Sequence, residues 1–206
     1  MAQFIRTFSE SFLQRHRDTH AKHPTFGTHR HPYLHDLMLE LAMAIPSGPD
    51  RPRSMLDYGC GKGVFMVEIA RLKLFHHIHG YDPAVAMFKA RPSHLYDVVT
   101  CLDVLDQLEN SFVESVIADV AQFTGHFAVF DVITRQSPKF EHLNPRSAET
   151  WYEIINRHML VSKMTIRPST QEEIDQGACP ERVIITAEPR DAATGDARTS
   201  GAKIVL

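Results

Sequence analysis

The sequence predicts an α/β fold in which a doubly wound, mostly parallel sheet is covered by helices on both faces. Short apolar runs at 54–58, 78–81, 97–102 and 127–133 alternate with segments of helical character, which is typical of parallel strands joined by crossover helices. A glycine-rich turn follows the first run, and two stretches of period-two alternation follow the last. These observations predict a parallel sheet that ends in a C-terminal antiparallel strand pair.

The first 50 residues predict an N-terminal helical cap. Phe4, Phe8 and Phe12 recur on one helical face, and a second apolar stretch runs over 33–45 until Pro46 stops it. The segment SGPDRPR that follows contains two prolines, so it ends the cap before the first strand.

The helices between the strands can be placed in the same way. The segment 64–73 follows the glycine turn directly, and 111–123 has an amphipathic pattern with Ser111 as its expected N-cap. A third helix is expected to begin near Ser147, which has the spacing of a cap and first turn.

The last part of the chain changes to the period of strands. Alternating apolar residues predict strands over 160–167 and 183–188. The segment 189–206 is small and polar except at its end, so we expect a disordered tail there. The predicted division is therefore a cap over 1–50, a core over 51–188 and this tail.

Composition excludes several classes of protein. The chain has 206 residues, a formal net charge of −3 and 43% hydrophobic residues, which excludes disordered and fibrous proteins. No segment approaches the roughly 18 consecutive apolar residues of a membrane helix, and the N-terminus lacks the apolar core of a signal peptide. The cysteines, Cys60, Cys101 and Cys179, are too widely spaced for a CxxC pair. We therefore expect a cytoplasmic protein with no membrane partner, and the slight negative charge argues against a nucleic-acid partner.

Histidine is the exception in this composition. The chain has 13 histidines, and six of them fall within the first 35 residues: His16, His20, His23, His29, His31 and His35. Their spacing matches no ligand pattern such as HExxH, and no cysteine or pair of carboxylates accompanies them in the sequence. We therefore expect solvated or helix-capping histidines and no metal site.

The most informative stretch is the turn DYGCGKG over 57–63, at the exit of the first strand. Its three alternating glycines allow positive φ angles and let a ligand lie against the backbone. The pattern differs from the dinucleotide fingerprint GxGxxG, because Gly63 lies one place too early, and from a P-loop, because Lys62 is followed by glycine. Asp57 would repel a pyrophosphate but suits a cation such as the amino group of an amino-acid moiety. Asp82 closes the second strand, where open α/β sheets place a ribose-binding carboxylate.

These residues resemble those of the class I S-adenosylmethionine-dependent methyltransferases, a Rossmann-like family. The segments LDYGCGKG, GYDP and YDVVTCLDVLDQL match the order and spacing of the family over about 53–188. The resemblance implies that the turn holds the methionine part of S-adenosylmethionine, that the acid after the second strand holds the ribose, and that the segment after the family's fourth strand lines the pocket. Carried over to this sequence, the cofactor-binding residues are Asp57, Tyr58, Gly59, Cys60, Gly61, Gly63, Asp82, Pro83, Cys101, Leu102, Asp103, Val104 and Leu105.

Two departures from the family pattern affect the expected site. The segment 82–97 is too short for the usual helix, third strand and adenine-binding loop, so the third strand is expected to be absent or vestigial. Met87, Phe88 or Lys89 would then form the adenine wall, unless this segment is a surface loop anchored by Phe88. The second departure is Gln107, where many relatives have a histidine, and glutamine cannot accept a proton as histidine can.

The acceptor site is expected in the polar insertion over 135–145. His142 is the preferred base or acceptor-orienting group, since an unperturbed imidazole accepts a proton near neutral pH, and Glu141 is the second candidate. Asp131 is expected to be structural, and Trp151 either walls the site or belongs to the core. The chain lacks the Asn-Pro-Pro-Tyr motif of members that methylate base amino groups. We therefore expect methyl transfer to a small-molecule or glycan-type acceptor, on oxygen rather than nitrogen.

Two other functions remain open from the sequence. One is a domain that binds S-adenosylmethionine without catalysis, and the other is a nicotinamide-dependent Rossmann enzyme, against which the glycine spacing argues. Tyr33 and His29 could close over the cofactor as a lid, although Tyr33 equally suits packing between helices. The sequence indicates no oligomeric state.

Overall fold

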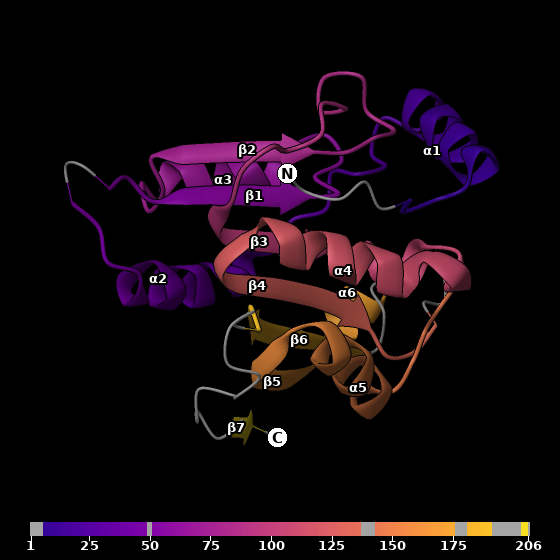
Figure 1. Ribbon diagram of the computed structural model, residues 1–206. Coiled ribbons are helices and arrows are strands. Elements are labelled where there is room, and N and C mark those ends of the chain that lie inside the picture. Colours follow the sequence, from indigo (N-terminus) through magenta and orange to yellow (C-terminus); the bar gives the residue numbers. More distant parts are fainter. Residues whose placement is uncertain (1–5, 49–50, 137–142, 176–180, 191–202, 206) are drawn as a thin grey trace.

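The computed structural model describes residues 6–48, 51–136, 143–175, 181–190 and 203–205, and the structural statements below concern these residues. Their strands form one seven-stranded sheet in the order β2-β1-β3-β4-β6-β5-β7. The strands are β1 (Ser54–Tyr58), β2 (His77–Tyr81), β3 (Tyr96–Leu102), β4 (Thr124–Ile133), β5 (Leu160–Pro168), β6 (Glu181–Glu188) and β7 (Lys203–Val205). The first four are parallel, and β6 runs antiparallel to both of its neighbours. The predicted parallel sheet with an antiparallel strand pair is therefore confirmed (Figure 1).

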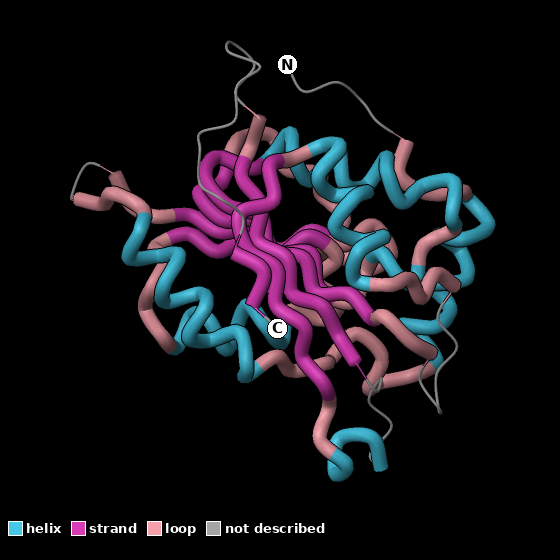
Figure 2. The backbone as a smooth tube through the Cα atoms, turned by 90° about the horizontal axis from the view of Figure 1, so that it is seen from below, coloured by secondary structure: helices cyan, strands magenta, loops and turns pink. Residues whose placement is uncertain are grey.

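Helices cover both faces of this sheet, as Figure 2 shows. Their bounds are α1 (Glu10–Lys22), α2 (His35–Ala44), α3 (Val64–Arg71), α4 (Val113–Phe123), α5 (Ala148–His158) and the short α6 (Gln171–Asp175). Leu56 and Val99 are buried with α4 and α5, whereas their chain neighbours Met55 and Val98 are buried with α2 and α3. Because successive side chains of a strand point to opposite faces, the apolar strands supply both halves of the core.

The predicted N-terminal cap divides into two parts. Met38 and Leu41 of α2 are buried against Phe65 of α3 and Val98 of β3, so α2 is one of the helices that cover the sheet. In contrast, α1 lies beyond the carboxyl ends of β1 and β2 (Figure 1). Within the predicted cap, α1 and α2 therefore pack against different partners, since Phe12 of α1 belongs to another buried cluster than the residues of α2.

The edge of the sheet at β2 confirms the missing third strand. The described residues from Asp82 to Leu95 form turns and loops and contain no strand. Asp82 N donates to Phe88 O at 2.9 Å, and Phe88 N donates to Val85 O at 2.9 Å. Met87 is 82% exposed. Phe88 therefore holds this loop through its backbone, and its ring lies near Gly63 of the glycine turn.

The helix caps were predicted with mixed success. Ser147 caps α5 as expected, because its hydroxyl accepts a hydrogen bond from Thr150 N at 3.2 Å. Ser111 does not cap α4, since a 3-10 turn over Asn110–Phe112 precedes that helix. Trp151 of α5 is fully buried and its indole N–H donates to Ile133 O at 3.0 Å, so it belongs to the core.

The far edge of the sheet corrects part of the predicted tail. Lys203–Val205 form β7, which pairs in parallel with β5. This pairing satisfies N–H and C=O groups that an edge strand would otherwise leave unpaired. The rest of the predicted tail after Arg190 lies outside the described residues. None of the helices described here is long and apolar enough to span a membrane.

Candidate functional site

The glycine turn adopts the backbone conformation that its sequence predicts. Gly59, Gly61 and Gly63 have φ angles of 80°, 52° and 77°, a region that side chains disfavour. A Cβ at Gly61 would lie 2.6 Å from Gly27 O, and one at Gly59 would collide with Val104. The turn must therefore stay free of side chains both for its backbone geometry and for the segments that pack against it.

Two buried carboxylates flank this turn. Asp57 is 3% exposed, and its Oδ1 accepts a hydrogen bond from the Thr100 hydroxyl at 2.8 Å. Burial raises the pKa of Asp57 to about 6, although the bond from Thr100 acts in the opposite direction. Asp82 accepts hydrogen bonds from Gly61 N at 3.1 Å and Ala84 N at 2.9 Å, and burial also raises its pKa. A cationic or hydroxyl-bearing ligand would compensate the burial of these carboxylates.

A cavity of about 1110 Å³ extends over the turn and joins elements that are far apart in the sequence. Its walls come from α1, the segment 23–33, the glycine turn, the start of the loop after β2 and the segment 102–108. The region from the end of β5 to the start of β6 adds Arg167, Ser169, Glu173 and Arg182. Of the predicted cofactor-binding residues, Asp57, Tyr58, Gly59, Cys60, Gly61, Asp82, Pro83, Leu102, Asp103 and Val104 line it.

The other three predicted cofactor-binding residues lie away from the cavity wall. Cys101 and Leu105 are fully buried among the core residues that face α4 and α5. Gly63 is the N-cap of α3 and lies near the Phe88 ring. The alternation of β3 explains the difference at Cys101, because its neighbour Leu102 points to the other face of the sheet. These three residues therefore support the pocket from behind.

The predicted acceptor-side residues have different outcomes. His142 and Glu141 lie outside the described residues. Gln107, the departure from the family pattern, lines the cavity and donates from Nε2 to Asp103 O at 2.7 Å. Asp103 has a φ of 55°, so Gln107 supports a strained backbone conformation of the kind often found at functional sites.

The segment 23–33 is tied to the glycine turn by its backbone. Lys62 N donates to Gly27 O at 2.9 Å, and Lys62 Nζ donates to the carbonyl oxygens of His23 and Pro24 at 3.0 and 2.7 Å. His29 and Tyr33 both line the cavity, as the lid hypothesis requires. Tyr33 also carries the Arg167 guanidinium 4.2 Å above its ring.

A closed ring of charged side chains lies beside this segment, and the sequence did not reveal it. Arg182 pairs with Oδ1 of Asp131 at 2.8 Å and with Oδ1 of Asp103. His31 completes the ring, because its Nδ1 lies 3.2 Å from Asp131 Oδ2 and its Nε2 lies 3.6 Å from Asp103 Oδ2. Tyr33 donates its hydroxyl proton to Asp131 Oδ2 at 2.6 Å. The only local signal was a charged residue in each of two apolar strands, Asp131 in β4 and Arg182 in β6.

The charges in the ring shift the affinities of its members for protons. Burial alone would raise the pKa of Asp131, but the neighbouring Arg182 guanidinium holds it below its ordinary value. Burial would likewise lower the pKa of His31, but its hydrogen bond with Asp131 and the charge of Asp103 raise it. Burial would also raise the pKa of Asp103, but Arg182 and His31 hold it below its ordinary value, so the ring holds two ionised carboxylates at the cavity wall.

Comparison with known proteins supports the fold and the family pattern. Residues 26–167 match the sequence model of a family described as "Methyltransferase domain". The N-methyltransferase NodS from Bradyrhizobium japonicum WM9, solved with S-adenosylhomocysteine, shares 15% identity over 88% of this chain and 100% of its own, with a TM-score of 0.56. The magnesium protoporphyrin IX methyltransferase ChlM from Synechocystis PCC 6803, solved with S-adenosylmethionine, shares 13% identity over 88% of this chain and 99% of its own, with a TM-score of 0.62.

A third similar structure is the Burkholderia thailandensis 1,6-didemethyltoxoflavin-N1-methyltransferase, solved with 1,6-didemethyltoxoflavin and S-adenosylhomocysteine. It shares 12% identity over 93% of each chain, with a TM-score of 0.57. At these identities the structural likeness shows the fold. No curated protein matches the sequence.

Proposed function

Because the chain belongs to the class I S-adenosylmethionine-dependent methyltransferases, we propose that it methylates a small-molecule or glycan-type acceptor, on oxygen rather than nitrogen. The observation that carries this proposal is the placement of Asp57, the glycine turn and Asp82 around one cavity. The family assignment replaces the nicotinamide-dependent alternative. Two of the similar structures, ChlM and the didemethyltoxoflavin methyltransferase, carry small-molecule substrates in their names, which supports an acceptor of that size.

The residues around the turn fit S-adenosylmethionine. The glycine turn offers a wall without side chains, Asp57 offers a buried negative charge for the amino group, and Asp82 offers carboxylate oxygens for the ribose hydroxyls. The unpartnered, buried Nδ1 of His20 lies at the same wall and adds one polar atom for the cofactor. When bound, S-adenosylmethionine supplies a methyl group on a sulfonium, and the sulfur leaves as a neutral thioether without needing a proton.

The chain has to position the acceptor and accommodate its proton. The cavity of about 1110 Å³ is slightly larger than the roughly 300–1,000 Å³ typical of small-ligand sites, so it suits a cofactor together with a small acceptor. We assign His29, His31 and Tyr33 to the acceptor-side wall in this proposal, because all three line the cavity and none of them belongs to the glycine turn or to the residues proposed for the cofactor. A base is needed for a hydroxyl acceptor, and His142 or Glu141 remains our proposal for that role.

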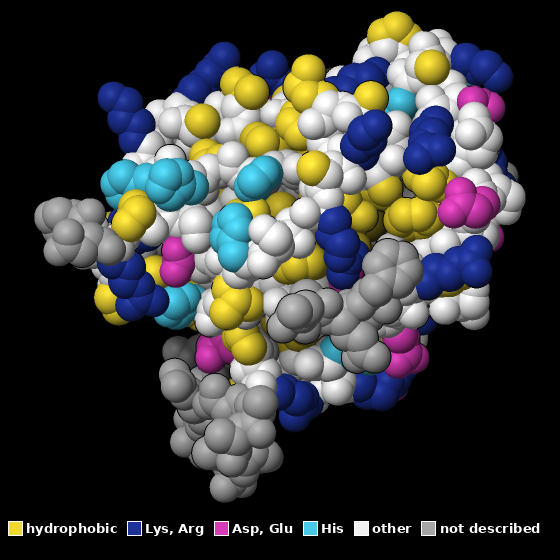
Figure 3. Space-filling model, turned by 45° about the horizontal axis from the view of Figure 1, so that its top comes forward, with side chains coloured by type: hydrophobic (Ala, Val, Ile, Leu, Met, Phe, Trp, Pro, Cys, Tyr) yellow, Lys and Arg dark blue, Asp and Glu magenta, His cyan; other side chains and the backbone are white. Residues whose placement is uncertain are grey.

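We propose no nucleic-acid acceptor. On the face shown in Figure 3, Lys and Arg side chains are scattered among acidic, apolar and histidine side chains instead of forming a stripe. The net charge of −3 supports the same choice, because nucleic-acid binders gain affinity by releasing counterions from phosphates.

The proposal is tested in two steps. Thermal unfolding is measured with S-adenosylmethionine, S-adenosylhomocysteine and NAD, and a ligand at a hundred times its dissociation constant should add about 2.7 kcal/mol, or roughly 5–10 °C. We expect a shift with both sulfur ligands and none with NAD. A panel of hydroxyl- and amine-bearing small molecules and glycans is then incubated with methyl-labelled S-adenosylmethionine. Label transfer only to amines would overturn the assignment to oxygen, and binding without transfer to any acceptor would favour a non-catalytic domain.

A further inference from the structure

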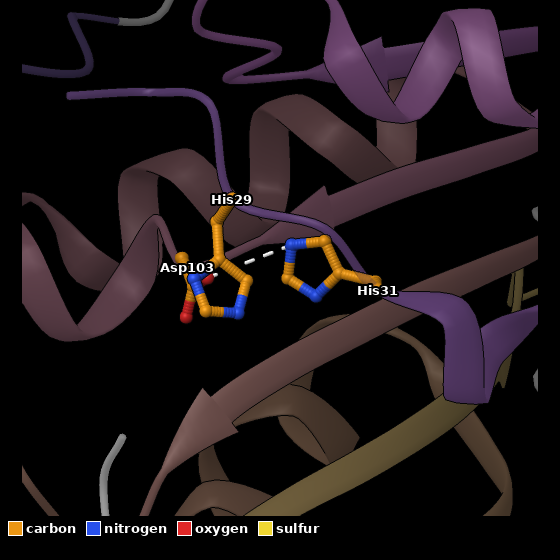
Figure 4. A group of neighbouring side chains, drawn as sticks. All are labelled: His29, His31 and Asp103. Atoms are coloured by element: carbon orange, nitrogen blue, oxygen red, sulfur yellow. Dashed lines mark ion pairs between the residues drawn. The ribbon is translucent and has the colours of Figure 1, made fainter. Parts of the chain in front are cut away.

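We propose that His29, His31 and Asp103 bind a divalent transition-metal cation, with zinc the best match, at the acceptor-side wall of the cavity. Each of the three residues offers one ligand atom, and these atoms lie within 4.8 Å of one another. Figure 4 shows the three side chains, with the ion pair between His31 and Asp103 marked. The histidines come from the segment 23–33 and Asp103 from the end of β3, so only the fold brings them together.

The distances suit a tetrahedral cation. Bonds of about 2.0–2.1 Å from zinc to nitrogen and oxygen place two ligand atoms roughly 3.4 Å apart. His31 Nε2 and Asp103 Oδ2 are already 3.6 Å apart. His29 is exposed on the cavity wall, and its ring centroid lies 4.8 Å from that of His31, so a side-chain rotation is enough to bring it in.

The surrounding residues orient the ligands as they do in known metal sites. Asp131 Oδ2 lies 3.2 Å from His31 Nδ1, and a proton on that nitrogen leaves the Nε2 lone pair facing Asp103. The His31 ring is held in place, because the residue is only 3% exposed. Arg182 engages Oδ1 of both carboxylates, which leaves Oδ2 of Asp103 for the cation.

The local charges also favour a cation. Asp103 and Asp131 contribute two negative charges, and Arg182 compensates one of them. The left-handed backbone at Asp103, held by Gln107, aims the carboxylate at the two histidines. Once His31 Nε2 has lost its proton, the negative charge that Arg182 leaves uncompensated attracts a cation to the gap between His31 Nε2 and Asp103 Oδ2.

The ligand set predicts the kind of metal and its use. Two imidazoles and one carboxylate suit zinc and other first-row cations better than magnesium or calcium, which prefer oxygen ligands alone. Three protein ligands leave a fourth position open, as in catalytic sites. A cation there would lower the pKa of an acceptor hydroxyl that reaches this position. This role rests on the proposed function, whereas cation binding by itself does not.

The sequence argument against a metal site was that the histidine spacing matches no ligand pattern and that no cysteine or pair of carboxylates accompanies the histidines in the sequence. In the fold, Asp103 fills that place beside His29 and His31. His16 and His20, in contrast, are packed against the Phe26 ring, and His16 also lies against the Phe12 ring.

The test is calorimetric titration of zinc chloride into the untagged, chelator-treated chain without S-adenosylmethionine. We expect one zinc per chain, binding about tenfold or more weakly in His29→Ala and in Asp103→Asn. His29 is exposed and Asp103→Asn preserves side-chain shape, so both variants should fold, as circular dichroism will check. His77→Ala, which removes an exposed histidine at the amino end of β2, is the matched control and should bind zinc as the natural chain does.

Cobalt(II) gives an independent readout, since a tetrahedral site produces strong visible absorption bands that an octahedral, solvated ion lacks. Bands in the natural chain that His29→Ala removes would support the site. Absence of stoichiometric binding, or equal binding by the natural chain and both variants, would overturn it. A thermal shift with S-adenosylmethionine but no cation binding would refute the metal site alone, whereas cation binding without methyl transfer would refute the proposed function alone.

Discussion

Replacing Asp57 with asparagine should stabilise the chain in the absence of ligand and weaken its binding of S-adenosylhomocysteine. Asp57 is buried, and its Oδ1 accepts a hydrogen bond from Thr100 at 2.8 Å. Asparagine has the same shape, and its carbonyl oxygen can accept that bond. Asp57→Asn therefore removes the charge of the side chain and little else.

The size of the effect follows from the pKa of Asp57. Burial raises it from 3.8 to about 6, and each pKa unit corresponds to about 1.4 kcal/mol, so the shift is worth roughly 3 kcal/mol. The folded chain binds this proton more tightly than the unfolded chain. The contribution of Asp57 to stability is therefore present below about pH 4 and is lost as the pH rises through about 6.

The expected result is a difference that depends on pH. At pH 7.5 the free energy of unfolding of Asp57→Asn should exceed that of the natural chain by up to about 3 kcal/mol, or roughly 6–12 °C in midpoint. Near pH 4 the two should agree. The affinity for S-adenosylhomocysteine should fall by about 10- to 100-fold, since a hydrogen bond to a charged group is worth about 1.5–3 kcal/mol.

Urea unfolding between pH 4 and 7.5 measures the stability, with the fluorescence of the single tryptophan, buried Trp151, as the signal. Calorimetry measures the affinity. Asp18→Asn, which changes an exposed carboxylate of α1, is the matched control. A stability difference that does not change with pH would refute the reasoning about burial. Unchanged affinity would remove Asp57 from the amino-group site.

Three further predictions concern the turn and the core. In Gly61→Ala the Cβ would lie 2.6 Å from Gly27 O at a positive φ, so thermal unfolding should show a loss of at least about 1–2 kcal/mol in the free energy of unfolding, and calorimetry should show weaker S-adenosylhomocysteine binding. The control is Gly48→Ala, whose Cβ would meet nothing within 4 Å, and its free energy of unfolding should change by no more than about 0.5 kcal/mol. Asp82→Asn loses one acceptor for a backbone N–H, so urea unfolding should show a loss of about 1–3 kcal/mol, and unchanged ligand affinity would contradict the ribose role. Trp151→Ala should cost about 3–5 kcal/mol by circular dichroism in urea, yet leave the ligand affinity of the folded chain unchanged; a loss of affinity would place this side chain in the site after all.

Local patterns were enough for most of the fold and for half of the site. The strands and the glycine turn can be predicted from a few neighbouring residues, because the alternation of a strand and the positive φ angles of glycines are local properties of the chain. For the same reason Asp57 and Asp82, each at the end of a predicted strand, were found at the cavity. The missing third strand was also predictable, since the length of 82–97 limits what it can form.

The parallel sheet, the glycine turn and the two acids beside it could be predicted from neighbouring residues. That α2 covers the sheet while α1 lines the cavity became clear in the folded chain, because an apolar stripe on a helix does not indicate which surface the helix will pack against. The ring of His31, Asp103, Asp131 and Arg182 was likewise settled by the order of the strands, which sets β4 beside β6 and brings the segment 23–33 over their ends. Pairing between such distant residues depends on how the strands are ordered in the sheet, and the periodicity of hydrophobic residues does not predict that order.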